Sequence, residues 1–191
     1  MLYRAEVYGI DPSESMIREA AKADTYGRYE LVRGDFPWPD NTFDGVMSNW
    51  VFLDIGSVEE MDVAAREIYR VLKPGGPFVM LVNNEEYVGK RTSTYQNGQP
   101  GKTYSPGDDI LVTYFKNGEQ RIQFKDYFWP TETYSSVMGR AGFRELTSYV
   151  PRLNPCTIEE ILFLQDKGVF PDVDFRVLVD ETPTVIVVGK K

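Results

Sequence analysis

The chain has 191 residues, and its 29 acidic side chains outnumber 21 basic ones, which gives a net charge of −8 at pH 7. It contains no histidine and a single cysteine, Cys156. A Ser-His-Asp or Cys-His hydrolase, a His-ligated metal and a haem on a proximal histidine are therefore excluded, and we expect no metal site. The acidic balance argues against a nucleic-acid-binding face, so we expect no nucleic-acid partner.

The remaining composition is that of an ordinary globular protein, with 42% hydrophobic and 26% charged residues. No apolar run approaches the ~18 residues needed to cross a bilayer, so we expect no membrane association. Residues 1–11 lack the basic and apolar pattern of a signal peptide, and a lone cysteine suits a reducing compartment. We therefore expect a cytoplasmic protein, and the length fits a single domain over residues 1–191.

The first part of the chain alternates strand and helix patterns. Ser13 precedes an amphipathic run that predicts a helix. Ser57 and Glu60 form a capping box, which predicts a second helix that ends at Lys73-Pro74-Gly75-Gly76. Short apolar runs between turn residues predict strands at 6–10, 29–33, 42–48 and 77–82.

Residues 83–128 have a different pattern, which is polar and rich in tyrosine and turn dipeptides. Asn117-Gly118 separates two alternating runs and predicts a β-hairpin over 110–124. We interpret 83–128 as an insertion that covers a substrate site. After it, the patterns predict helices at 131–141 and 157–167 and strands at 143–150 and 184–188.

This alternation predicts an α/β fold, in which a mostly parallel sheet has helices on both faces. Such sheets bind ligands at the carboxyl ends of their strands. Asp11 follows the first strand, where a carboxylate could accept both hydroxyls of a ribose or simply cap the next helix. Asp35 could accept from an adenine amino group or act as a turn residue. Met16 could pack on the adenine or in the core.

Three segments in order, VYGIDPSESMI (7–17), ELVRGDFPWPDNTFDGVMSNWVFLDI (30–55) and EIYRVLKPGGPFVMLV (67–82), resemble the small-molecule branch of the class I S-adenosylmethionine-dependent methyltransferases. The resemblance implies a Rossmann-like sheet, S-adenosylmethionine as cofactor, S-adenosylhomocysteine as product and a small-molecule substrate. It also implies cofactor-binding roles for particular residues: the ribose on Asp11, the adenine beside Met16, Asp35 and the Phe36 backbone, and the methionine moiety near Asn49 and Trp50.

Four aromatic residues lie in or beside the insertion. We expect Tyr87, Tyr95, Tyr127 and Trp129 to line the substrate site, although ordinary packing of a hairpin on the sheet explains each of them equally well. Without histidine, a base for a hydroxyl acceptor would be a carboxylate or a tyrosine, unless the acceptor is already nucleophilic. The sequence therefore leaves the catalytic residue unassigned.

The sequence departs from the family pattern in one respect. Only ten residues precede Asp11, and none of the 16 glycines forms a Gly-x-Gly motif, so the first strand and its glycine-rich cofactor loop are missing. Three explanations remain open: an N-terminally shortened enzyme, a second copy or partner chain that supplies the missing central strand, or a pseudoenzyme or subunit that has lost the cofactor. A nicotinamide-dependent enzyme is a weaker alternative, because its glycine fingerprint is also absent and because the Lys73-Pro74-Gly75-Gly76 strand entry and the late hairpin match methyltransferases better.

Overall fold

The computed structural model describes residues 5–92, 94–152, 159–160, 162–163 and 182–191. The chain divides into two compact units, Met1–Pro39 and Asp40–Lys191, and each is described by itself. None of the described helices is long and apolar enough to cross a membrane. The predicted helix at 157–167 lies largely outside the described residues.

The first unit is a β-α-β element. Strand β1 (Tyr8–Asp11) and strand β2 (Arg28–Leu31) are parallel, and helix α1 (Glu14–Ala23) connects them. The helix begins after Ser13, whose side chain accepts a hydrogen bond from the Met16 amide, as the sequence predicts. The loops after β1 and β2 consequently start from the same edge of the two-stranded sheet, because Asp11 pairs with Leu31.

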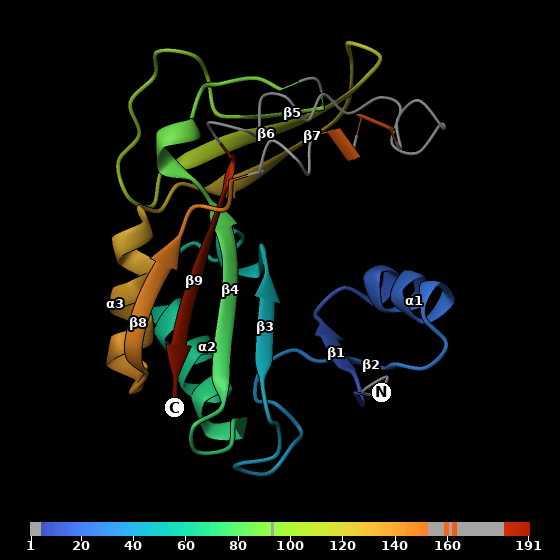
Figure 1. Ribbon diagram of the computed structural model, residues 1–191, viewed down its shortest axis with the longest axis vertical. Helices are drawn as coiled ribbons and strands as arrows, with labels where there is room; N and C mark the ends of the chain where they lie inside the picture. Colours follow the sequence, from blue (N-terminus) through green and yellow to red (C-terminus); the bar gives the residue numbers. More distant parts are fainter. Residues whose placement is uncertain (1–4, 93, 153–158, 161, 164–181) are drawn as a thin grey trace. The chain divides into compact units, whose positions relative to one another are not determined.

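The second unit contains a four-stranded sheet in the order β3-β4-β9-β8 (Figure 1). Its strands are β3 (Val46–Asn49), β4 (Pro77–Asn83), β8 (Arg144–Tyr149) and β9 (Thr184–Lys190). β3 is parallel to β4, and β9 is antiparallel to both β4 and β8. β3, β4 and β8 therefore run in one direction and β9 alone runs in the other, which confirms the mostly parallel sheet.

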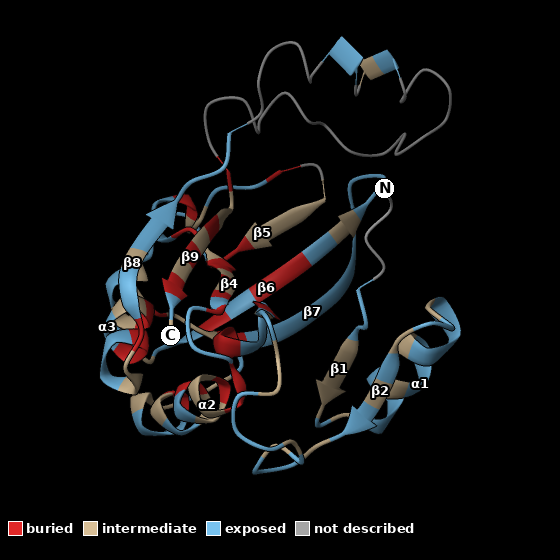
Figure 2. Cartoon of the chain, turned by 60° about the horizontal axis from the view of Figure 1, so that its bottom comes forward, coloured by how far each residue is buried: buried red, intermediate tan, exposed pale blue. Residues whose placement is uncertain are grey.

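One face of this sheet forms the core of the unit. Phe78, Met80 and Val82 on β4 are fully buried, and they share a face with Val185 and Val187 on β9. Helix α2 (Val58–Val71) and helix α3 (Thr131–Ala141) cover this face, as Figures 1 and 2 show.

The opposite face of the sheet is less covered. Along β4 the buried residues alternate with half-buried Val79 and Leu81, and along β9 with Ile186 and Val188. Apolar side chains on both faces are typical of a sheet that is covered on both sides. In the described part of this unit, helices cover only one of them.

Residues 83–128 contain a three-stranded antiparallel sheet. β6 (Asp109–Lys116) and β7 (Glu119–Tyr127) form the predicted hairpin, whose turn residues Asn117 and Gly118 have φ values of 53° and 78°. β5 (Tyr95–Asn97) pairs with β6 and was not predicted, because three residues within a turn-rich stretch carry no periodic signal. Two single 3-10 turns, η1 (Val51–Leu53) and η2 (Glu85–Tyr87), follow β3 and β4.

The two faces of α2 allow a matched test of where the core lies. Val71 is 1% exposed and Val63 is 54% exposed on the same helix. We expect Val71→Ala to lower the free energy of unfolding by about 2 kcal/mol, because it removes two buried methyl groups and leaves a cavity. Val63→Ala should change it by less than about 0.5 kcal/mol. Urea unfolding followed by circular dichroism measures both, and equal losses would contradict this packing.

Candidate functional site

In the first unit, polar groups gather after β1 and β2. The Asp11 Oδ1 atom accepts a hydrogen bond from the Ser13 amide at 2.7 Å, and this bond closes the turn that leads into α1. Asp11 therefore has the predicted structural role at the start of that helix. Its Oδ2 atom accepts none among the described residues. The Arg33 side chain donates from Nε to the Pro12 carbonyl oxygen at 3.1 Å and so ties the two loops together. Asp11 thus has a structural role and one oxygen left for a ligand.

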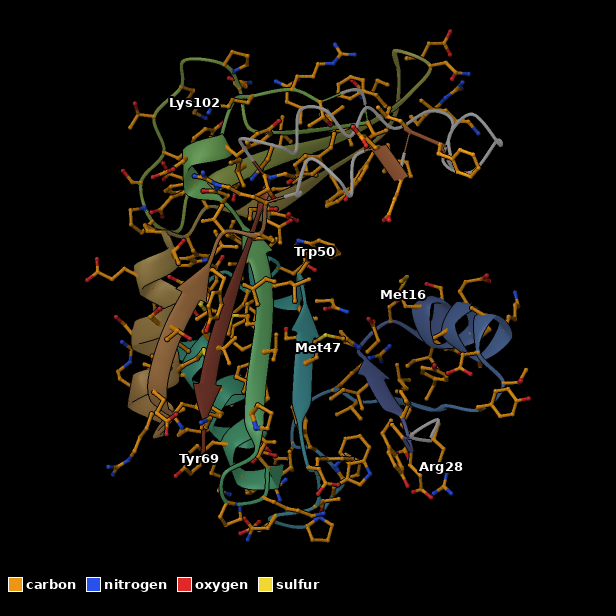
Figure 3. The ribbon with its side chains drawn as sticks, in the orientation of Figure 1. Met16, Arg28, Met47, Trp50, Tyr69 and Lys102 are labelled. Carbon is orange, nitrogen blue, oxygen red and sulfur yellow. The ribbon has the colours of Figure 1, made fainter. Side chains whose placement is uncertain are left out.

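The other predicted cofactor residues of this unit lie on its surface. Met16 on α1 is 56% exposed, so its side chain lies on the surface of this unit and not in a core (Figure 3). Asp35 is exposed after Gly34, whose φ of 117° suits glycine. The Phe36 ring is half-buried and meets the Trp38 ring edge-on at 6.3 Å.

In the second unit, three polar or aromatic residues lie at the carboxyl end of β3. Asn49 and Trp50 are exposed, and Trp50 lies just past the end of the strand with a left-handed φ of 58° (Figure 3). Ser48 is buried, and its hydroxyl oxygen has no hydrogen-bond partner among the described residues. A ligand at this strand end could therefore supply a partner that the protein lacks.

A small cavity lies where β4, β5 and β7 end. It has room for about one water molecule. Its lining comprises Leu53, Asn83, Glu85, Val88, Asn97, Tyr127, Phe128, Trp129 and Tyr134. Two of the four predicted substrate residues, Tyr127 and Trp129, are in this lining, and Tyr87 and Tyr95 are not.

Hydrogen bonds fix several of these aromatic side chains. The Trp129 indole donates from Nε1 to the Ile55 carbonyl oxygen at 3.0 Å, and the Tyr95 hydroxyl donates to Asn83 Oδ1 at 2.9 Å. Tyr87 is buried within the unit. Tyr87 and Tyr95 thus lie outside the cavity lining, whereas Tyr127 and Trp129 belong to it.

Two buried polar atoms at the cavity have no partner. Asn97 is 4% exposed and Tyr134 is fully buried, yet the Asn97 Oδ1 atom and the Tyr134 hydroxyl form no hydrogen bond to the described residues. Such atoms are rare in folded proteins and cost about 1–3 kcal/mol each unless water or a ligand binds them. The sequence analysis missed both residues, because neither a helix-face tyrosine nor a turn-like Asn-Gly pair indicates a ligand.

The sequence analysis also missed a pair of carboxyl groups beside the cavity. Asp126 on β7 is 4% exposed and lies against Asp54, the residue after η1. Burial first, and then the charge of Asp54 and a hydrogen bond with it, together raise the pKa of Asp126 to about 7. A charged residue at position 126, in phase with Ile122 and Phe124, was the available signal.

The raised pKa of Asp126 has a consequence for stability. Because an unfolded aspartate has a pKa of about 3.9, the folded chain holds this proton more tightly between pH 4 and 7. The stability that the protonated group contributes is present at low pH and is lost as the pH rises through 7. We expect the free energy of unfolding to fall between pH 5 and pH 8, on the order of 2 kcal/mol from this group.

Urea unfolding at several pH values measures this dependence. Asp126→Asn should flatten it, whereas Asp109→Asn, an exposed aspartate on neighbouring β6, should leave it in place. A pH dependence that is equally steep in the Asp126→Asn variant would show that another group is responsible.

Comparison with known proteins relates this architecture to one group of enzymes. Residues 1–80 match the family model of the methyltransferase domain. An N-demethylindolmycin N-methyltransferase of Streptomyces griseus is 29% identical over 150 residues, which are 76% of this chain and 62% of that protein. A demethylmenaquinone methyltransferase of Listeria monocytogenes is 40% identical over 148 residues, which are 73% of this chain and 56% of the relative. The chain thus spans less than two thirds of the length of these relatives.

Solved structures give the same result for the fold. An S-adenosylmethionine-dependent methyltransferase from Mesorhizobium loti superimposes with a TM-score of 0.60 at 17% identity, over 97% of this chain and 80% of that one. A Burkholderia thailandensis 1,6-didemethyltoxoflavin-N1-methyltransferase, solved with its substrate and S-adenosylhomocysteine, has a TM-score of 0.53 at 12% identity, over 97% of this chain and 61% of that one. The chain is therefore related to the class I S-adenosylmethionine-dependent methyltransferases and has their Rossmann-like fold.

Proposed function

We propose that this chain transfers a methyl group from S-adenosylmethionine to a small molecule and releases S-adenosylhomocysteine. The observation that carries the proposal is the set of uncommitted polar groups at the carboxyl ends of parallel strands. They are the Asp11 Oδ2 atom after β1, the Ser48 hydroxyl on β3 and the buried acceptors beside β4. The sequence relationship to methyltransferases over most of the chain supports the same reading.

The residues present suit the cofactor in chemical type. Asp11 would accept the ribose hydroxyls through Oδ2 while Oδ1 keeps its bond to Ser13. Met16 and Phe36 offer apolar surface for the adenine, and Asp35 offers an acceptor for its amino group. Asn49 and Trp50, with the buried Ser48 hydroxyl beside them, would hold the methionine moiety.

Bound S-adenosylmethionine supplies a methyl group that is already activated on a sulfonium sulfur. The residues of the chain therefore have to align the acceptor and exclude water rather than activate the donor. Trp129 and Tyr127, which line the cavity in the second unit, suit that task because they are rigid and largely apolar. We retain Tyr95 and Tyr87 as proposed members of the wider substrate site.

The names of the relatives support a small-molecule acceptor. The proteins that match by sequence are named for N-demethylindolmycin and demethylmenaquinone, and one structural neighbour is named for a toxoflavin precursor. We propose an acceptor of this size. The lone cysteine suits the reducing cytoplasm, and we propose that the acceptor is methylated there.

We further propose that another strand pairs with β3. The Trp50 amide donates to the Leu81 carbonyl oxygen on β4. Backbone groups of successive strand residues point to alternate edges, so those of Met47 and Asn49 point away from β4, to the other edge of β3. No strand pairs with that edge among the described residues. An open apolar edge of this kind invites a partner, either a second copy or another chain, and Met47 on it is 64% exposed.

A second candidate function is a non-catalytic subunit of a methyltransferase complex. The open edge of β3 is the observation that favours it, because a strand of a full-length enzyme could pair there. Stable association with such an enzyme and no binding of cofactor would support this alternative over the enzyme.

Titration calorimetry with S-adenosylhomocysteine tests the proposal on the 191-residue chain. We expect binding in the micromolar range, and a loss of at least about tenfold in Asp11→Asn, because a charge-assisted hydrogen bond contributes about 1.5–3 kcal/mol. The amide of asparagine keeps an acceptor for the Ser13 amide, so the turn into α1 is preserved.

Glu30→Gln is the matched control. Glu30 is an exposed residue on β2, and its substitution removes one negative charge from the same unit, as Asp11→Asn does. It should bind as the unmodified chain does. No heat of binding at millimolar S-adenosylhomocysteine would count against the enzyme and in favour of the subunit.

A further inference from the structure

One face of the three-stranded sheet is continuous and largely apolar. Directly opposite residues share a face of an antiparallel sheet, and the register pairs Ile110 with Asp126, Val112 with Phe124 and Tyr114 with Ile122. β5 adds Tyr95 opposite Tyr114 and Asn97 opposite Val112. We call these eight residues the acceptor face.

The acceptor face is buried at one end and exposed at the other. Ile110, Val112, Asn97 and Asp126 are buried at the inner end. At the outer end Ile122 is 59% exposed, and Tyr114 and Phe124 are about two fifths exposed with their rings stacked at 5.9 Å. Figure 2 shows buried residues in the middle of β6 and exposed residues along most of β7. Aromatic side chains exposed together in this way are typical of a ligand-binding surface.

The inner end of the acceptor face offers hydrogen-bond acceptors. Asp126 lies against Asp54, and the titratable groups that interact with Asp126 from the neighbouring elements are Tyr95, Tyr114 and Tyr134; Glu85 in turn acts on Tyr134. Lys125 is on the opposite face of β7 and pairs with Asp109 at 3.1 Å. The Asn97 Oδ1 atom and the Tyr134 hydroxyl, both more than nine-tenths buried and without a partner, line the adjoining cavity.

We propose that the methyl acceptor is a molecule with a flat apolar body and a terminal N–H or O–H group, that its body lies on Tyr114, Ile122 and Phe124, and that the Asp54–Asp126 pair binds the terminal group and receives its proton. This inference rests on the proposed function. It names the acceptor class and the base, neither of which the family relationship assigns.

The proposed methyl transfer forms one bond, breaks one bond and moves one proton. The lone pair of the acceptor nitrogen or oxygen forms a bond to the methyl carbon, and the carbon–sulfur bond breaks with its electron pair going to sulfur. The acceptor loses its proton to a carboxylate oxygen of the pair, which then carries one more proton than before. Asp126 is shielded from water, and a proton taken up by the ionised pair is shared between the two carboxyl groups, so the ionised pair can accept a proton near neutral pH without a histidine.

Three probes with the same ring system and different end groups test this inference without the cofactor: 2-naphthylmethylamine, 2-naphthylmethanol and 2-methylnaphthalene. Their affinities are measured at pH 8 by titration of backbone amide resonances of the chain. We expect Asp126→Asn to weaken the amine, the alcohol or both by about tenfold, and to leave 2-methylnaphthalene within twofold. Phe124→Ala should weaken all three alike.

The amine and the alcohol distinguish a nitrogen acceptor from an oxygen acceptor. Asp54→Asn, at an exposed position, should repeat the pattern of Asp126→Asn without disturbing the fold, and circular dichroism checks both variants. If no probe binds, or if both variants affect the three probes equally or not at all, the inference is overturned. Calorimetry with S-adenosylhomocysteine on the same samples separates the two proposals: its binding should be unchanged in Asp126→Asn, and its absence in every sample would refute the proposed enzyme instead.

Discussion

The structure of the second unit depends on the pairing of β9 between β4 and β8. Seven consecutive residue pairs join β4 to β9, from Pro77–Lys190 to Asn83–Thr184. This register places Val185 and Val187 on the same face as Phe78, Met80 and Val82, which α2 and α3 then cover. It also fixes where β4 ends, and therefore where η2 and the three-stranded sheet begin. The β4–β9 register therefore helps to fix the position of the candidate acceptor site within the second unit.

The polar groups that lack partners are concentrated where strands end. Ser48 is the last residue but one of β3, Asn97 ends β5, and Tyr134 lies in the first turn of α3 and lines the same cavity as Asn97. Buried Asp126 and exposed Asp54 add two carboxyl groups that lie against each other. Unsatisfied buried groups at the carboxyl ends of strands are where a sheet of this class binds its ligand.

The sequence predicted local structure well and the site only in part. The capping serines Ser13 and Ser57, the helix at 131–141 with Gly142 after it, and the Asn117-Gly118 hairpin are confirmed, because each depends on neighbouring residues alone. The proximity of Asp54 to Asp126 could not be predicted, since 72 positions separate them and only the packing of β7 on the loop after η1 brings them together. The same holds for the cavity that Tyr127, Trp129 and Tyr134 line.

The central claim is that this chain binds S-adenosylhomocysteine and that Asp11 is among the residues that hold it. Backbone amide resonances of the isotope-labelled chain, recorded with increasing S-adenosylhomocysteine, test it most directly. The account predicts saturable shifts of the Asp11 and Asp35 amides, which weaken in Asp11→Asn and persist in Glu30→Gln. No shift of either amide, or the same shifts in the Asp11→Asn variant, would contradict the proposed cofactor site.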